Sequence, residues 1–299
     1  MWRFVLRTCL FLSLPVVWGA FCYAINRWLI SQNRTVIQER MLFMGDSQMR
    51  NAVAPRFFRD ARNVSQVAEP MVMTRMKLER FLAESERDTI VVGVGAQTLS
   101  RYQELKFEDP AVAPELFDRI YPLAGPSELD GLPVDRQAYF RSIIRNMCLY
   151  PSMDHRPYVG SFIAAPVRSF IRNEQEMCLR HFGPEGRMGV SDLMAAQVEQ
   201  IARLCREQGV VLIWVIMPVT RAYYELVPPE QWDFLFACLE RTREQGARVI
   251  DLARQEIPEG GFRDADHLNE KGAELFTRAL KDTFRKGPVQ VRTASGFAQ

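Results

Sequence analysis

The residues best suited to chemistry are a serine near the start of the chain and a histidine near its end. Ser47 lies in a Gly-Asp-Ser turn, and His267 is preceded by Asp264 and Asp266. A serine hydroxyl is a weak nucleophile and needs a base to take its proton. Of the three histidines in the chain, His267 is the one with carboxylates one and three residues before it. A carboxylate at the −3 position can hold the ring N–H and stabilise the imidazolium, so this pattern predicts a serine nucleophile with a histidine base.

Alternating apolar runs and amphipathic stretches predict the elements that must position these residues. Strands are expected over residues 41–44, 89–94, 210–217 and 248–252, with a weak strand and loop at 63–68. Helices are expected over residues 77–86, 133–150, 191–208, 229–245 and 269–286. This alternation favours an α/β fold in which helices cover both faces of a parallel sheet. Ser47 and Gln97 directly follow predicted strands, where the chemistry of such sheets is found.

Each of these residues also has a purely structural interpretation. Ser47 can serve as a helix cap, and His267 as a capping or core histidine. Asp264 and Asp266 precede a helix, where acids are favourable at the positive end of the helix dipole. We expect Asp266 to be solvated or capping. His155 and His181 lie in an irregular segment, and both are predicted to be non-catalytic.

Three segments resemble the conserved blocks of the SGNH (GDSL-type) hydrolases. MLFMGDSQ (41–48) and DADHLNEKGAELF (264–276) resemble the first and last blocks, and TIVVGVGAQ (89–97) resembles the third. The resemblance covers roughly residues 41–283. It implies a flavodoxin-like three-layer sandwich with a central parallel sheet, and esterase or acyl-transfer chemistry. It also implies Ser47 as the nucleophile, His267 as the base and Asp264 as the carboxylate that orients the base.

The sequence departs from that family at the groups that would bind the oxyanion. Gln97 stands where the family usually has Asn, and it offers the same amide N–H from one methylene further away. The glycine of the second block is not evident, and a backbone N–H from the 63–70 loop, such as that of Gln66, is expected in its place. Ser47, Gln97 and Gln66 are therefore the predicted oxyanion donors. Arg221 follows another strand end and is either a contact for an anionic substrate or a surface arginine.

The N-terminus carries an uncharged apolar stretch over residues 8–25. As a helix it would be about 27 Å long, enough to cross most of a bilayer. We predict a membrane anchor over residues 1–30 and a linker over 31–40, against the alternatives of a cleaved signal peptide or a buried core helix. Flanking arginines do not fix the orientation, but a single N-terminal anchor most often exports the rest of the chain. The body is therefore expected outside the cytoplasm, in the periplasm of a Gram-negative cell.

The remaining organisation follows from composition. The SGNH-like domain is predicted over residues 41–286 with a proline-rich insertion at about 151–190, followed by a flexible tail over 287–299.

A net charge of +2 gives no indication of a basic surface that would bind nucleic acid. Since no HExxH or paired CxxC motif occurs, neither a metal nor another cofactor is expected. Cys148 and Cys178 could form a disulfide across the insertion or remain reduced.

Three functions are compatible with this sequence. The first is a membrane-anchored serine ester hydrolase that removes acyl groups from an envelope polysaccharide or related ester through an acyl-serine. The second is an O-acyltransferase that passes the same acyl group to a sugar hydroxyl. The third is a catalytically silent binding or assembly module. The expected partners are the membrane, an acylated carbohydrate or ester, and a membrane acyl-transfer or polysaccharide-assembly protein.

Overall fold

The computed structural model describes residues 1–32, 37–168 and 170–286. The predicted flexible tail, residues 287–299, and part of the predicted linker therefore lie outside the described residues. Contacts divide the described chain into two compact units. Unit 1 comprises the described residues within 1–36 and 106–158, and unit 2 those within 37–105 and 159–299.

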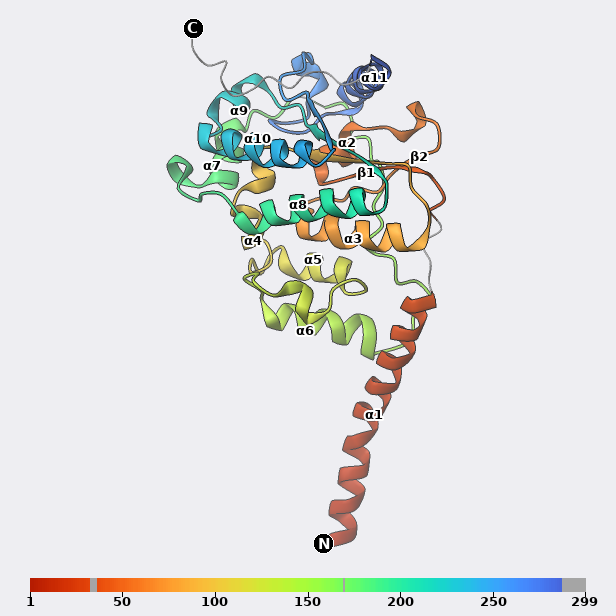
Figure 1. The fold of residues 1–299 in the computed structure, drawn as a ribbon. Helices are drawn as coiled ribbons and strands as arrows, with labels where there is room; N and C mark the ends of the chain where they lie inside the picture. Colours follow the sequence, from red (N-terminus) through yellow and green to blue (C-terminus); the bar gives the residue numbers. More distant parts are fainter. Residues whose placement is uncertain (33–36, 169, 287–299) are drawn as a thin grey trace. The chain divides into compact units, whose positions relative to one another are not determined.

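Unit 2 is built on a parallel sheet of five strands (Figure 1). The strands are β1 (Met41–Met44), β2 (Ala61–Asn63), β3 (Thr89–Val94), β4 (Val211–Ile216) and β5 (Arg248–Asp251). Their spatial order is β2-β1-β3-β4-β5, and every neighbouring pair is parallel. This is the doubly wound order, in which strands are added on one side of β1 and then on the other, so that the strand order reverses between β1 and β3. The predicted α/β fold class is confirmed.

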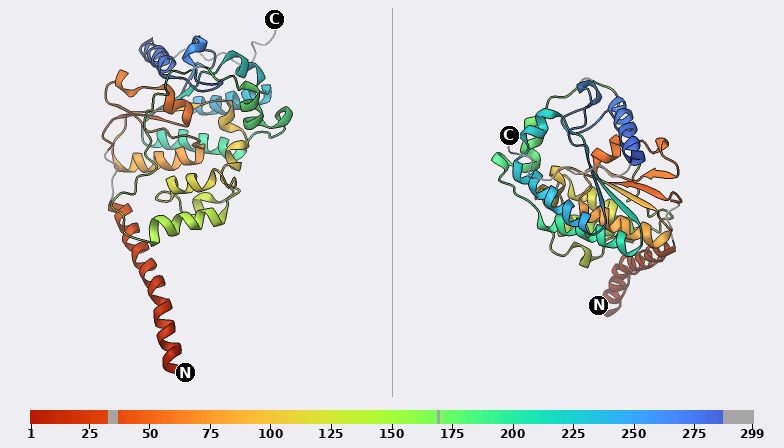
Figure 2. Two further views of the ribbon diagram at one scale, coloured as in Figure 1. Left: turned by 180° about the vertical axis from the view of Figure 1, so that it is seen from behind. Right: turned by 45° about the horizontal axis from the view of Figure 1, so that its top comes forward.

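Helices cover both faces of this sheet (Figure 2). One layer contains α2 (Ser47–Ala52) and α11 (Glu270–Lys286), and the other contains α3 (Met71–Glu84), α8 (Asp192–Glu207) and α10 (Pro229–Glu244). Met49 of α2 and Val53, the residue after α2, pack with Phe276 and Leu280 of α11 and with strand residues in one buried cluster. Because both faces are covered, the central strands β3 and β4 are apolar at every position except Thr89 at the start of β3.

The segments that carry Ser47 and His267 are thereby brought into one layer.

The shorter elements of unit 2 are η1 (Pro55–Phe57), η2 (Ala96–Leu99), α4 (Tyr102–Leu105), α7 (Glu174–Phe182), η5 (Pro184–Gly186), α9 (Arg221–Leu226) and η6 (Glu259–Gly261). Helix α3 begins at Met71, six residues before the start that the sequence predicts. Its first turns are buried on all sides, so they show no amphipathic pattern that would mark the start.

Unit 1 combines the N-terminal helix with part of the long β3–β4 connection. It contains α1 (Trp2–Gln32), α5 (Ala113–Ile120), η3 (Pro126–Leu129), α6 (Arg136–Ile143) and the π-helix η4 (Ile144–Cys148). Helix α1 is long and apolar enough to cross a membrane. Ile30 of α1 packs with Tyr121 and Met147 in a small buried cluster. The chain leaves unit 2 at Lys106, well before the boundary near residue 151 that the proline-rich composition indicated.

Gly272, in the first turn of α11, is fixed by a close backbone approach. A Cβ atom at this position would lie 2.0 Å from the carbonyl oxygen of Gly261. Asn269 ties the same two segments together, since its Nδ2 donates to Gly260 O at 2.8 Å and its Oδ1 accepts from Lys271 N at 3.0 Å. The turn before the last helix is therefore held against that helix by both packing and hydrogen bonds.

We expect Gly272→Ala to lower the free energy of unfolding by about 1–3 kcal/mol, the usual effect of overpacking. The clash should outweigh the gain of about 1 kcal/mol in helix propensity. Gly260→Ala is the matched control, because a Cβ there meets no atom within 4 Å. Denaturant unfolding of the full chain in detergent measures both. Equal stability of the Gly272→Ala variant and the wild type would contradict this packing.

Candidate active site

Ser47 stands at the carboxyl end of β1, at the start of α2. Gly45 makes the turn with φ +135°, and a Cβ there would lie 2.9 Å from Gly93 O, so a glycine is required on both grounds. Asp46 caps the helix by accepting the backbone N–H of Gln48 at 2.9 Å. The Ser47 side chain is half-buried, and its backbone N–H is one of the helix-start groups that have no acceptor within a helix.

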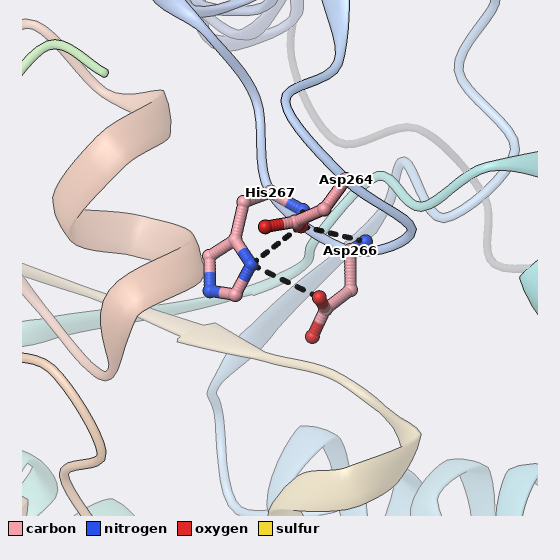
Figure 3. Close-up of side chains that lie close together, drawn as sticks. All are labelled: Asp264, Asp266 and His267. Atoms are coloured by element: carbon pink, nitrogen blue, oxygen red, sulfur yellow. Dashed lines mark hydrogen bonds and ion pairs between the residues drawn. The ribbon is translucent and has the colours of Figure 1, made fainter. Parts of the chain in front are cut away.

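His267 is held by a compact loop between β5 and α11. The loop is pinned by an antiparallel bridge between Phe262 and Leu268. Asp264 Oδ1 accepts the backbone N–H of His267 at 3.0 Å and lies 2.7 Å from its ring Nδ1 (Figure 3). The other carboxylate oxygen of Asp264 accepts Nε of Arg263 at 2.9 Å. Asp264 is thus fixed on both sides, and it fixes the orientation of the imidazole.

The structure brings the three predicted catalytic residues together. Ser47 Oγ lies 2.8 Å from His267 Nε2, the nitrogen that Asp264 does not contact. The serine and the histidine are 220 positions apart in the sequence. A hydroxyl, an imidazole and a buried carboxylate in a line have the geometry of a serine nucleophile with its base and orienting acid.

Asp266 occupies a place that the sequence analysis missed. The expectation of a solvated or capping acid is wrong, because Asp266 is only 3% exposed and its Oδ1 lies 3.0 Å from His267 Nδ1 (Figure 3). Its second oxygen accepts Gln48 Nε2 at 3.5 Å. The tight fold-back of the loop turns the −1 residue inward as well as the −3 residue. A local pattern of two acids before a histidine does not reveal this turn.

The two carboxylates change the titration of the buried pair. Burial lowers the pKa of His267, but the charge of Asp266 and the hydrogen bond to Asp264 outweigh it and raise the pKa to about 10. Burial likewise opposes ionisation of Asp266, yet the charge of His267 holds the pKa of that carboxyl below its usual range. The raised pKa favours the protonated imidazole at neutral pH, in which Nε2 donates to Ser47 Oγ. Loss of that proton reverses the bond, so that Ser47 donates to His267.

The same three side chains offer donor atoms suited to a metal ion. The donor atoms of Asp264, Asp266 and His267 all lie within 4.8 Å of one another. However, His267 Nδ1 faces both carboxylates, and a cation there would have to replace the proton that this nitrogen shares with them. The arrangement is better matched to an imidazolium between two acids, and the absence of a metal stays a prediction.

The predicted oxyanion donors are placed as follows. Gln97 is buried after β3, with its Nε2 3.5 Å from Asp46 Oδ2, and its side chain lies against Gly95. The backbone N–H of Gln66 donates to Gly45 O at 3.1 Å, so it is used to hold the loop after β2 rather than being free for a substrate. The donors that stay compatible with the prediction are the N–H of Ser47 and the amide of Gln97.

The other residues singled out in the sequence lie elsewhere or have structural partners. Arg221 is exposed and paired with Glu225 at 2.7 Å, as expected of a surface arginine. His155 Nδ1 bonds the Tyr121 hydroxyl, and His181 Nδ1 bonds the Tyr223 hydroxyl. Cys148 and Cys178 are both free thiols in this structure.

A returning segment, whose described residues are 159–168 and 170–173, contacts both halves of the site. Ile163 N donates to Arg50 O in α2 at 3.2 Å, and Ile171 N donates to Arg263 O at 3.0 Å. Asn173 Oδ1 accepts Ala265 N at 3.1 Å, inside the loop that carries His267. The segment thus binds the helix behind Ser47 and the loop of the base, which keeps the two halves of the site in register.

We expect Asp266→Asn to move the pH dependence of Ser47 reactivity. In the wild type the neutral imidazole accumulates only as the pH approaches the raised pKa of His267, so the rate should rise into the alkaline range. Removing one carboxylate lowers the pKa of His267, so the pH at which the rate rises should fall by about 1–3 units. The rate of inactivation by a fluorophosphonate, measured against pH, tests this. Asp233→Asn, at an exposed position of α10, is the control. A loss of rate without movement of the inflection would count against this role.

Comparisons with known proteins add little to this geometry. No family model matches the chain, and no curated protein matches it. A solved structure of a protein from Streptococcus pneumonia, whose description names platelet activating factor, is 12% identical with a TM-score of 0.37. That match covers 93% of this chain and 98% of the other. A likeness at this level carries no argument about function, which therefore has to come from the site.

Proposed function

We propose that this protein is a membrane-anchored serine ester hydrolase of the SGNH type, which removes acyl groups from an envelope polysaccharide or a related ester. The observation that carries the proposal is the line of contacts from Ser47 Oγ through His267 to Asp264, at 2.8 and 2.7 Å. Both ends of the line belong to segments that resemble blocks of that family. A helix cap or a core histidine would not require this long-range alignment.

The reaction proceeds in two halves at Ser47. Its Oγ attacks the acyl carbon while the hydroxyl proton moves to His267 Nε2, and the ester C–O bond then breaks as His267 returns that proton to the leaving alcohol. In the second half, water attacks the acyl-serine, His267 takes one proton from the water and delivers it to Ser47 Oγ, and the free acid leaves. Asp264 keeps the ring oriented throughout.

Negative charge on the carbonyl oxygen needs donors close to Ser47. The backbone N–H of Ser47 is suited to this role, and the amide of Gln97, beside Asp46, is the second proposed donor. Removal of one such donor typically slows an enzyme by about 10²–10³-fold. A glutamine in this position therefore bears on rate and substrate choice rather than on whether the acyl-serine forms.

The apolar helix α1 supports the membrane location. Its length and composition suit a single crossing, and we propose that the rest of the chain lies on the extracytoplasmic side. The body would then meet envelope esters close to the membrane. The choice of a carbohydrate ester follows from this location and from the family resemblance.

A fluorophosphonate probe should label the purified full chain, and Ser47→Ala should abolish the labelling. His267→Ala should slow it by about 10²–10⁴-fold, the usual contribution of a general base. Ser161→Ala, at an exposed position of the returning segment, is the control and should label like the wild type. Unchanged labelling of a folded Ser47→Ala variant would exclude the proposed nucleophile.

Hydrolysis and acyl transfer give different products from one assay. With p-nitrophenyl acetate as the acyl donor, we expect acetate to be released at the same rate whether or not an oligosaccharide acceptor is added. The Ser47→Ala variant gives the background. If acetylated oligosaccharide forms at the expense of free acetate, as mass spectrometry would show, the protein is a transferase instead.

A further inference from the structure

Unit 1 exposes a group of large apolar side chains at the end of α6 and in the turn that follows. Phe140, Ile144, Leu149, Tyr150 and Met153 are between 53% and 79% exposed. We call these five residues the apolar patch. Single exposed apolar residues are common on soluble proteins, but a cluster of this size on one short segment marks a site of interaction.

The apolar patch is joined to the apolar part of α1. Trp18 Nε1 donates to Leu149 O at 2.9 Å, and a Cβ at Gly19 would lie 3.7 Å from Cys148 Cβ. Figure 1 and the left view of Figure 2 both show the end of α6 beside the C-terminal half of α1. Trp18 lies seven residues before Ile25, the end of the uncharged stretch, which is about 10 Å along a helix. A bilayer that accommodates this stretch therefore reaches the level of the apolar patch.

The backbone of this turn is satisfied from within the protein. The Asn26 side chain, which is fully buried, donates to the carbonyl oxygens of Met147 and Tyr150 at 2.9 Å each. Its Oδ1 accepts the backbone N–H of Ser152 at 2.8 Å. Irregular backbone is expensive in an apolar medium unless its polar groups have partners. The Asn26 side chain thus makes this turn compatible with a low-dielectric surrounding.

Charges around the apolar patch fit the headgroup region. Arg136, Arg141 and Arg145 are exposed on α6 and η4, and Arg145 is paired with Asp118. Tyr150 borders a hollow of about 420 Å³ that Asp118 and Asp154 also line. Apolar side chains flanked by arginines are typical of segments that lie in a membrane interface and meet anionic lipids.

We propose that the apolar patch of unit 1 inserts into the same bilayer that α1 crosses, so that the protein is held by a helix and an interfacial surface together. The occupant of the patch is the lipid bilayer, with its anionic headgroups against the arginines. This inference rests on the membrane anchoring in the proposed function and is independent of the chemistry at Ser47. An anchor alone would leave unit 1 free to turn with α1 about the membrane normal and to tilt, whereas insertion of the patch fixes its face toward the lipid.

Site-specific photo-crosslinking in the full chain tests the proposal. A diazirine amino acid replaces one residue at a time in protein reconstituted into vesicles of phosphatidylcholine and phosphatidylglycerol, and mass spectrometry identifies the adducts. We expect lipid adducts at positions 144 and 149 in yields comparable with position 12 of α1. Position 115, occupied by the exposed Glu115 of α5 in the same unit, is the matched control and should give only water adducts.

Each outcome bears on the proposal. Lipid adducts at 12 with only water adducts at 144 and 149 would overturn it while leaving the anchor intact. A lack of lipid adducts at all three positions would overturn both the insertion and the anchor. Fluorophosphonate labelling of Ser47 in the same samples reports the folded catalytic unit, so a failure of the proposed chemistry is seen separately from a failure of the membrane contact.

Discussion

The contact between Ser47 and His267 constrains much of unit 2. It requires the end of β1 and the loop after β5 to meet, although β5 lies three places away from β1 in the sheet. Parallel pairing throughout makes this possible, because all five carboxyl ends share one edge. The pairing of α2 with α11 on one face then sets the separation of the two segments, and the close approach of Gly272 to Gly261 fixes the loop against the last helix. The 2.8 Å distance between Ser47 Oγ and His267 Nε2 thus depends on the order of the strands, one layer of helices and one backbone contact.

Buried polar side chains hold the irregular segments of both units. In unit 2, the fully buried Lys77 donates to Val64 O at 2.6 Å and pairs with Glu69 at 2.7 Å, which fastens the loop after β2. In unit 1, Asn26 does the same for the turn after η4. Each group is paired where it is buried, as required in a low-dielectric interior. The positions of these loops are therefore decided by a few specific bonds and not by the general apolar packing.

The sequence was sufficient for the features with local signals. The β-branched runs marked the central strands, the serine turn marked the start of α2, and the spacing of Asp264 and His267 marked the contact between their side chains. It was insufficient where the signal is long-range. The burial of Asp266 depends on a fold-back of its loop, and the role of Asn26 depends on a turn 121 residues away. The division of the β3–β4 connection at Lys106 depends on which segments pack together across long stretches of sequence, and the local composition does not report that packing.

The second carboxylate beside His267, that of Asp266, bears on the pH dependence of the proposed reaction. A charge accelerates the reaction only if it stabilises the transition state more than the resting state. Where His267 is already a cation at rest, Asp266 stabilises both, and the proton must first be lost to create a base. Because the two carboxylates raise the pKa of His267 to about 10, the neutral form is the minor one at pH 7. Where the ring is neutral, the same carboxylate favours the imidazolium that would form in the proposed attack by Ser47. Asp266 is therefore expected to increase the rate of the proposed reaction in alkaline conditions, or wherever a bound substrate displaces the proton from the resting imidazolium.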